Sequence, residues 1–298
     1  MSLEKLETEQ KNELTCKLDQ LSPLEIVRLM NNEDKTVALA VEQQLSEIAR
    51  AVEVIGATLE NGGRLYYFGA GTSGRLGILD ASECPPTFGT LPELVQGFIA
   101  GGPEAIVRAI EGAEDNHELG VEDVNKSGVK SGDVVVGIAA SGRTPYVKGA
   151  LYQSQQLGAY TISLSCNSHS EINDNADITI NVVVGPEVLT GSTRLKAGTA
   201  QKMVLNMLTT GGMIRIGKVY NNLMVNVQAT NYKLRERVKH IIMEVADVDY
   251  KEAESLVDLS GGDAKIAIVM KLKGVTLETA AQLLQETNGR VRDALESK

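Results

Sequence analysis

The sequence contains no tryptophan, and it has only three phenylalanines, three histidines and three cysteines among 298 residues. The cysteines, Cys16, Cys84 and Cys166, are odd in number and far apart, which predicts free thiols in a reducing compartment. The histidines are scattered, without the spacing of metal ligands, so we predict no metal site and no cofactor. No apolar run is long enough to span a membrane, and the first residues are charged. We therefore expect a cytoplasmic protein without a membrane partner.

Basic residues are also too few for a nucleic-acid-binding protein. Lysine and arginine number 29 against 39 aspartates and glutamates, which gives a net charge of −10. Such a chain is repelled by a phosphate backbone, so we predict no nucleic-acid partner. Hydrophobic residues make up 43% of the chain, which is enough to bury a sizeable core and excludes a disordered protein.

The middle of the chain alternates short apolar runs with helical patterns. The predicted strands are 64–68, 94–100, 133–140, 159–165 and 177–184, and the predicted helices between them are 72–83, 103–119, 145–157 and 171–176. Further helices are predicted from about residue 22 to 60 and from 196 to about 244. This alternation is typical of βαβ units, so we predict an α/β fold in which helices sandwich a parallel sheet. Ligands should then bind at the carboxyl ends of the strands.

The last fifty residues differ in texture. Short helical patterns over 250–259, 263–272, 276–285 and 289–295 are separated by glycine-containing turns. We therefore predict two domains: residues 1–245, which form the α/β domain with its amino-terminal helices, and residues 246–298, which form a small helical domain.

Three loops combine glycine with hydroxyl residues, at Gly69–Arg75, Ala139–Pro145 and Gly191–Lys196, and each precedes a predicted helix. Free amide groups and the positive end of a helix favour a phosphate there, whereas a single such loop would more often only cap its helix. The predicted ligands of a phosphorylated substrate are Gly71, Thr72, Ser73, Ser141, Gly142, Thr144, Ser192, Thr193 and Lys196. The first loop also matches the dinucleotide fingerprint, but the next predicted strand lacks the carboxylate that holds a ribose.

Two glutamates continue apolar stripes of predicted helices. Glu83 follows Leu76 and Leu79, and Glu114 follows Ile106 and Ile110 at four-residue spacing. A partly buried carboxyl group can hold and donate a proton near neutral pH. We therefore predict Glu83 and Glu114 as an acid–base pair.

These loops and the unusual segment Leu79–Phe88 resemble the sugar isomerase (SIS) domain superfamily, which includes relatives of the glucokinase regulatory protein. The whole chain closely resembles its N-acetylmuramic acid 6-phosphate etherase family, and the tail resembles a ubiquitin-associated (UBA-like) helical fold. The resemblance implies a cytoplasmic, homodimeric lyase of cell-wall sugar recycling. It would cleave the D-lactyl ether by elimination and then hydration, giving N-acetylglucosamine 6-phosphate and D-lactate. Glu83 matches the family's proton donor and Glu114 its second catalytic carboxylate.

Two alternatives stay open at this point. An aldose–ketose isomerase acting on a phosphosugar would use the same anchor and a glutamate base, but it would release no lactate. A non-catalytic sugar-phosphate sensor would bind its ligand without consuming it. Lys196 and Arg194 are candidates for binding the lactyl carboxylate.

Overall fold

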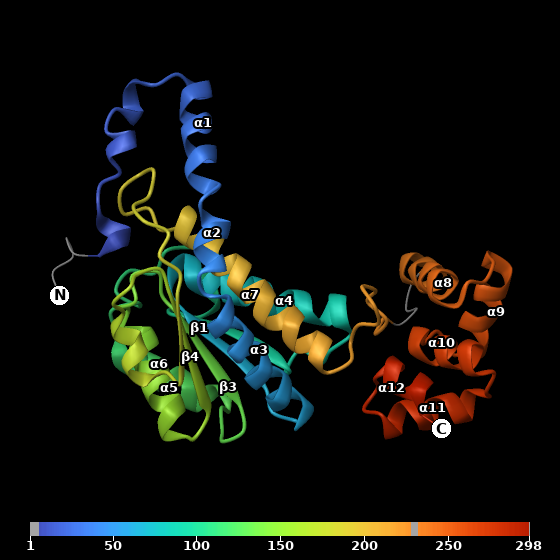
Figure 1. The fold of residues 1–298 in the computed structure, drawn as a ribbon. Coiled ribbons are helices and arrows are strands. Elements are labelled where there is room, and N and C mark those ends of the chain that lie inside the picture. Colours follow the sequence, from blue (N-terminus) through green and yellow to red (C-terminus); the bar gives the residue numbers. More distant parts are fainter. Residues whose placement is uncertain (1–5, 228–231, 298) are drawn as a thin grey trace. The chain divides into compact units, whose positions relative to one another are not determined.

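The computed structural model describes residues 6–227 and 232–297 (Figure 1). Their contacts divide the chain into two compact units, each of which is described by itself. The first comprises the described residues up to Ser82 together with Pro92–Thr209, and the second comprises Glu83–Leu91 together with the described residues from Thr210 onward. The domain boundary predicted after residue 245 stays a prediction.

The core of the first unit is a five-stranded parallel sheet with the order β2-β1-β3-β4-β5. The strands are β1 (Leu65–Gly69), β2 (Val95–Ile99), β3 (Val134–Ile138), β4 (Tyr160–Ser165) and β5 (Ile178–Asn181). Every residue of β1 and β3 is buried, as expected for central strands with helices on both faces. The predicted strands and the α/β fold are confirmed.

Helices cover both faces of this sheet (Figure 1). The helices before residue 216 are α1 (Pro23–Asp34), α2 (Val37–Glu42), α3 (Leu45–Glu60), α4 (Gly71–Phe88), α5 (His117–Ser127), α6 (Pro145–Gln156) and α7 (Lys196–Arg215), of which α1 extends away from the sheet. Short 3-10 turns span Glu7–Glu9 (η2), Glu13–Thr15 (η3), Leu18–Gln20 (η4), Pro103–Ile106 (η5) and Glu171–Asn175 (η6). Side chains along β1 alternate between the faces: Tyr66 and Phe68 pack with Val147 and Leu151 of α6, whereas Tyr67 bonds to Asp80 of α4.

Two helix predictions around the site were wrong. The segment predicted as one helix over 103–119 instead forms η5, a series of turns and then α5. Gly112 adopts a positive φ, which interrupts the helix. The Asn116 side chain then accepts from the Leu119 amide and so caps α5, which begins at His117. Glu114 therefore lies in a turn rather than on a helical stripe. The helix predicted to end at Glu83 continues as α4 through Pro85 and Pro86 to Phe88.

The second unit contains a helical region at the carboxyl-terminal end of the chain. Its helices are α8 (Tyr232–Ala246), α9 (Tyr250–Leu259), α10 (Ala264–Lys273), α11 (Leu277–Glu286) and α12 (Val291–Glu296). Asp249, Asp263 and Thr276 cap three of them with their side chains, and Ile242, Val257 and Ile268 are fully buried in the core. The predicted helical tail is confirmed, but the helix predicted over 196–244 is broken after Arg215.

Cys84 and Cys166 are buried, Cys16 is exposed, and all three are free thiols. Over residues 6–227 and 232–297, no helix combines the length and the hydrophobicity needed to cross a bilayer.

Candidate active site

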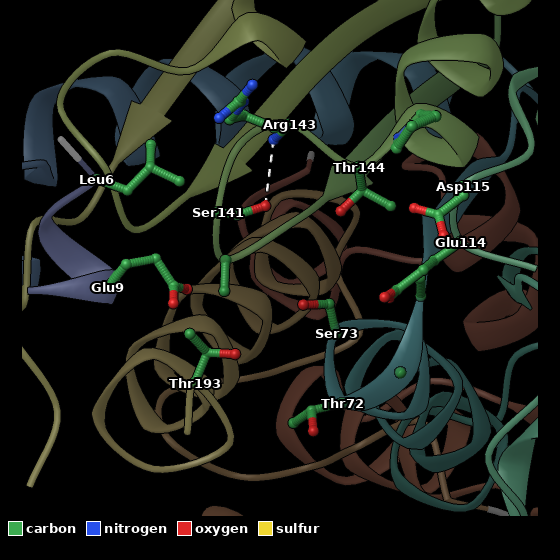
Figure 2. A pocket seen from close by; sticks show the side chains of 14 residues that line it. Leu6, Glu9, Thr72, Ser73, Glu114, Asp115, Ser141, Arg143, Thr144 and Thr193 are labelled. Atoms are coloured by element: carbon green, nitrogen blue, oxygen red, sulfur yellow. Dashed lines mark hydrogen bonds between the residues drawn. The ribbon is translucent and has the colours of Figure 1, made fainter. Parts of the chain in front are cut away.

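A cavity of about 610 Å³ opens where β1 and β3 end, at the carboxyl edge of the sheet (Figure 2). It is lined by Leu6, Glu9, Ala70, Gly71, Thr72, Ser73, Glu114, Asp115, Ala140, Ser141, Arg143, Thr144, Pro145 and Thr193. All of these residues belong to the first unit. The cavity therefore collects residues from all three predicted loops together with one of the two predicted glutamates.

The first loop places the amino-terminal end of α4 directly on β1. Gly74 makes this approach possible, because a Cβ there would lie 2.6 Å from the Ile99 side chain and 2.7 Å from the Gly69 carbonyl oxygen. The first amide groups of α4 thus face the carboxyl end of the strand, where an anion is favoured. Ser73 is buried, and its hydroxyl donates to Oε1 of Gln201 on α7 at 2.9 Å. The hydroxyl lies on the cavity wall, and its single proton has to turn from Gln201 to donate to a bound phosphate.

The second loop turns sharply before α6. Gly142 has a φ of +69°, and a Cβ there would come within 2.2 Å of the Ser170 hydroxyl, so only glycine fits. Thr144 stands at the N-cap of α6, yet its side chain makes no capping hydrogen bond. Ser141 accepts a hydrogen bond from the amide of Arg143 at 3.3 Å. The Thr144 hydroxyl is therefore not used to cap the helix, which favours a ligand-binding role.

The third loop contributes less than predicted to this cavity. Thr193 lines it, but Ser192 and Lys196 do not. The Lys196 ammonium is buried in an ion pair with Glu33 at 2.7 Å. The carboxylate of Glu187 accepts from the amides of Lys196 and Ala197 at 2.9 and 3.0 Å. Glu187 thus occupies the amino-terminal end of α7, which differs in this way from α4 and α6.

Glu187 was not predicted from the sequence. Burial raises the pKa of its carboxyl group, and the two amide hydrogen bonds together with Lys196 oppose that shift. A glutamate nine residues before the helix that it caps gives no local signal of its role, because the contact depends on how the loop folds back.

Glu114 and Glu83 are placed differently by the structure. The carboxylate of Glu114 points into the cavity from the turn before α5, with Asp115 beside it (Figure 2). Glu83 is ten residues further along α4 than Ser73, in the second unit, and it does not line the cavity. Both glutamate side chains are exposed in the single chain. The expectation that both glutamates are partly buried was therefore wrong within a single chain. Leu79 is exposed, so the residues before Glu83 do not form a buried apolar stripe, and Glu114 lies in a turn.

Cations are scarce around the cavity. Arg143 lies on its wall, but its guanidinium bonds to Glu171 at 3.0 Å, and Lys148 bonds to the same carboxylate at 2.7 Å. The hydrogen bond from Lys148, aided by Arg143, lowers the pKa of Glu171. An anion in this cavity would therefore be held mainly by hydroxyl groups and by the amide groups of α4. The start of α6 offers less, because Pro145 has no amide hydrogen and the Tyr146 amide donates to the Glu114 carbonyl at 3.0 Å.

Asp80 supports the first loop of the cavity. Its carboxylate is buried and accepts from Tyr67 at 2.9 Å, Thr209 at 3.1 Å and Asn206 at 3.2 Å. Burial raises the pKa of its carboxyl group in spite of these bonds. Asp80 thereby joins β1, α4 and α7 behind the first loop.

Comparison with known proteins identifies the family. A model of the SIS domain matches residues 113–211, and a model of the glucokinase regulatory protein N-terminal SIS domain matches residues 47–155. An N-acetylmuramic acid 6-phosphate etherase of Geobacillus sp. (strain WCH70) is 58% identical over 294 residues, which cover 99% of this chain and 100% of the relative. The chain belongs to the N-acetylmuramic acid 6-phosphate etherase family.

Other relatives agree with this placement. The etherase of Actinobacillus pleuropneumoniae serotype 5b (strain L20) is 55% identical, with 99% of this chain and 97% of the relative covered. Among solved structures, a phosphoheptose isomerase from Francisella tularensis matches with a TM-score of 0.50 and 15% identity, over 65% of this chain and 100% of that one. That likeness confirms the SIS fold, and the sequence relatives identify the etherase family within it.

Proposed function

We propose that this chain is a lyase that cleaves the D-lactyl ether of N-acetylmuramic acid 6-phosphate, in the cytoplasmic recycling of cell-wall sugars. The observation that carries the proposal is the cavity itself. It brings Ser73, Ser141 and Thr144 to the ends of two parallel strands and places the Glu114 carboxylate beside them. The curated relatives that share nearly the whole chain are etherases of this sugar phosphate.

The proposed binding mode starts from the phosphate. The hydroxyl groups of Ser73, Ser141 and Thr144, with amide groups of α4, hold the 6-phosphate. The other predicted ligands that lie around the phosphate are Gly71, Thr72, Gly142 and Thr193. Anchoring a remote phosphate fixes the position of the sugar ring relative to the carboxylates, which lowers the entropic cost of the reaction. Ser192 and Lys196 were also predicted to bind the substrate, but neither of them lines this cavity, so their roles stay predictions.

The chemistry then needs one base and one acid. When the sugar ring is open, the C1 aldehyde makes the proton on C2 acidic. Glu114 removes that proton, and the electron pair forms the C2–C3 double bond while the C3–O bond to lactate breaks. Glu83 gives its proton to the departing lactyl oxygen. It then takes a proton from the water that adds at C3, while Glu114 returns its proton to C2. Each positioned acid or base contributes about 10²–10⁴-fold in rate.

The proposed assembly is a homodimer. Helix α1 has no buried residue and exposes Leu24 and Val27 at 62% and 58% (Figure 1). Apolar side chains on an unpartnered helix are typical of a surface that packs against another subunit. A second copy of this chain is the partner that the family resemblance implies.

A lactate assay tests the function. The protein, incubated with N-acetylmuramic acid 6-phosphate, should release D-lactate, and the Glu83→Gln and Glu114→Gln variants should bind the sugar but release at least about 10²-fold less per unit time. Conversion of glucose 6-phosphate to fructose 6-phosphate, with no lactate released from N-acetylmuramic acid 6-phosphate, would instead support the isomerase. Binding without turnover in the unmodified protein would support the sensor.

A further inference from the structure

The segment before α1 packs onto the loops that form the cavity. Thr8 and Asn167 are both fully buried, and they exchange two hydrogen bonds: the Thr8 amide donates to Asn167 Oδ1 at 3.3 Å, and Asn167 Nδ2 donates to Thr8 Oγ1 at 3.1 Å. Asn167 Nδ2 also donates to the carbonyl of Ala140 at 2.9 Å. Leu6 is 1% exposed, and Glu7 bonds to Ser168. The amino-terminal segment is thereby fixed to the residue that precedes Ser141.

This attachment places Glu9 in the cavity. Its side chain is half-buried and reaches in from the wall opposite Glu114, close to Thr193 (Figure 2). A Cβ built on Gly191 would lie 3.3 Å from Oε2 of Glu9, so the carboxylate also lies beside the third loop. Within the part of the chain that the structure describes, no hydrogen bond or ion pair holds this carboxylate. Arg143, the cation on the same wall, is bonded to Glu171.

The charge of Glu9 determines what it can bind. A carboxylate is a hydrogen-bond acceptor only, and it repels a phosphate in the same cavity. A half-buried carboxylate without a partner is costly, so a ligand that donates a hydrogen bond to it is favoured. On a phosphorylated amino sugar the donor groups are the ring hydroxyls and the acetamido N–H.

We infer that Glu9 is a specificity-determining residue that accepts a hydrogen bond from the sugar, at a point away from its phosphate. This inference rests on the proposed function, because it requires a phosphosugar in the cavity. Glu9 lies before residue 47, where the earlier of the two matching SIS models begins. It therefore adds a contact for the sugar that the matched SIS segment does not supply.

Binding measurements on the full chain separate this role from a structural one. The probes are N-acetylglucosamine 6-phosphate, glucose 6-phosphate and inorganic phosphate, each titrated by calorimetry into the unmodified protein, Glu9→Gln, Glu9→Ala and the control Glu13→Gln. Glu13 is exposed on the same segment and outside the cavity lining. Glu9→Ala should weaken sugar phosphate binding about 10- to 100-fold and leave inorganic phosphate within twofold or tighter. Glu9→Gln should show a smaller loss, and Glu13→Gln none.

The two sugars identify the donor group. A loss with both sugars assigns a ring hydroxyl, and a loss confined to N-acetylglucosamine 6-phosphate assigns the acetamido N–H. In steady-state assays the loss should appear as a raised KM with kcat changed less than threefold. Unchanged sugar binding in Glu9→Ala, or an equal loss for inorganic phosphate, would overturn the inference. Failure of the unmodified protein to bind either sugar phosphate would instead contradict the proposed function.

Discussion

Ser73 and Thr144 reach the cavity in different ways, and the difference predicts how each tolerates substitution. Thr144 makes no capping bond, whereas Ser73 donates to a buried glutamine whose Nε2 has no partner among the described residues. Thr144→Val should therefore raise KM about tenfold with little change in stability, since only a ligand contact is lost. Ser73→Ala should raise KM and also lower the free energy of unfolding by about 1 kcal/mol.

Thr199→Val is the matched control, because Thr199 is exposed on α7, lies outside the cavity lining, and donates its hydroxyl to the carbonyl of Leu195, the residue before the helix. Steady-state kinetics and urea unfolding followed by circular dichroism measure both effects in a chain that lacks tryptophan. A KM unchanged in Thr144→Val would remove this hydroxyl from the phosphate site.

The buried carboxyl group of Asp80 should make stability depend on pH. Its raised pKa means that the folded protein holds the proton more tightly than the unfolded chain does. The stabilisation from this proton is complete below the ordinary pKa of ~4 and is lost as the pH rises through the higher folded pKa. Asp80→Asn cannot titrate, so the unmodified protein should lose stability relative to this variant as the pH rises above ~4.

Urea unfolding of both proteins at several pH values measures that difference. Asp80→Leu provides a second comparison, since it leaves the donors on Tyr67, Asn206 and Thr209 without their acceptor and should cost about 2–4 kcal/mol at any pH. Stability curves that run parallel for the unmodified protein and Asp80→Asn would contradict the role of burial.

Among the loops, the segment that carries Glu114 has an unusual anchor. The guanidinium of Arg75 on α4 donates to the carbonyls of Ile106 at 2.7 Å, Ala105 at 2.8 Å and Arg108 at 3.1 Å. One side chain thus ties the helix of the first loop to the segment between η5 and α5. Arg75 is a positioning residue for Glu114 rather than a substrate ligand, because its guanidinium is already engaged by the backbone.

Arg75→Ala should lower kcat at least about tenfold, because a loosened Glu114 loses its fixed distance to the sugar, while KM changes less. Arg75→Lys should recover only part of the loss, since a single ammonium cannot reproduce three bonds from a planar fork. Hydrogen exchange over residues 104–115 should become faster in both variants. Arg50→Ala, which removes a surface ion pair with Glu47 on α3, is the control and should change none of these readouts. An unchanged kcat in Arg75→Ala would show that the segment holds Glu114 without this anchor.

The elements themselves were largely predictable from the sequence. The five strands follow from apolar runs between turn residues, and the phosphate loops follow from glycine and hydroxyl residues before helices. The segment 103–116 was not predictable, because Ile106 and Ile110 mimic a helical stripe that Gly112 interrupts. Glu9, Asp80 and Glu187 carry no local signal, since the folding of the chain around them sets their roles. The Thr8–Asn167 bonds bring Glu9 to the cavity, Asp80 bonds to α7, and Glu187 reaches the start of α7 only because its loop folds back.

At the scale of the whole assembly, the proposed homodimer allows a test of whether the two catalytic glutamates of one site come from different subunits. Glu114 lines the cavity of its own chain, whereas Glu83 does not. In a homodimer the partner chain can supply Glu83, so a mixture of Glu83→Gln and Glu114→Gln chains should regain activity that neither variant has alone. In a mixed dimer one of the two sites is intact, so purified mixed dimers should reach about half of normal activity. In an unsorted mixture random pairing makes half of the dimers mixed, which gives about a quarter.

Co-expression of the two variants with different affinity tags, followed by tandem purification of mixed dimers, provides this measurement. A mixture of two independently folded Glu114→Gln preparations is the control and should stay inactive. No recovery in the purified mixed dimer would assign both glutamates to the same chain.

The most direct test of the proposed chemistry follows an oxygen atom. In elimination followed by hydration, water adds at C3 of the sugar, and lactate departs with its original ether oxygen. Reaction in water labelled with oxygen-18 should therefore place the label on O3 of N-acetylglucosamine 6-phosphate and leave D-lactate unlabelled, as read by mass spectrometry. Label in the lactate would show attack on the lactyl carbon, and it would contradict the mechanism assigned to this cavity.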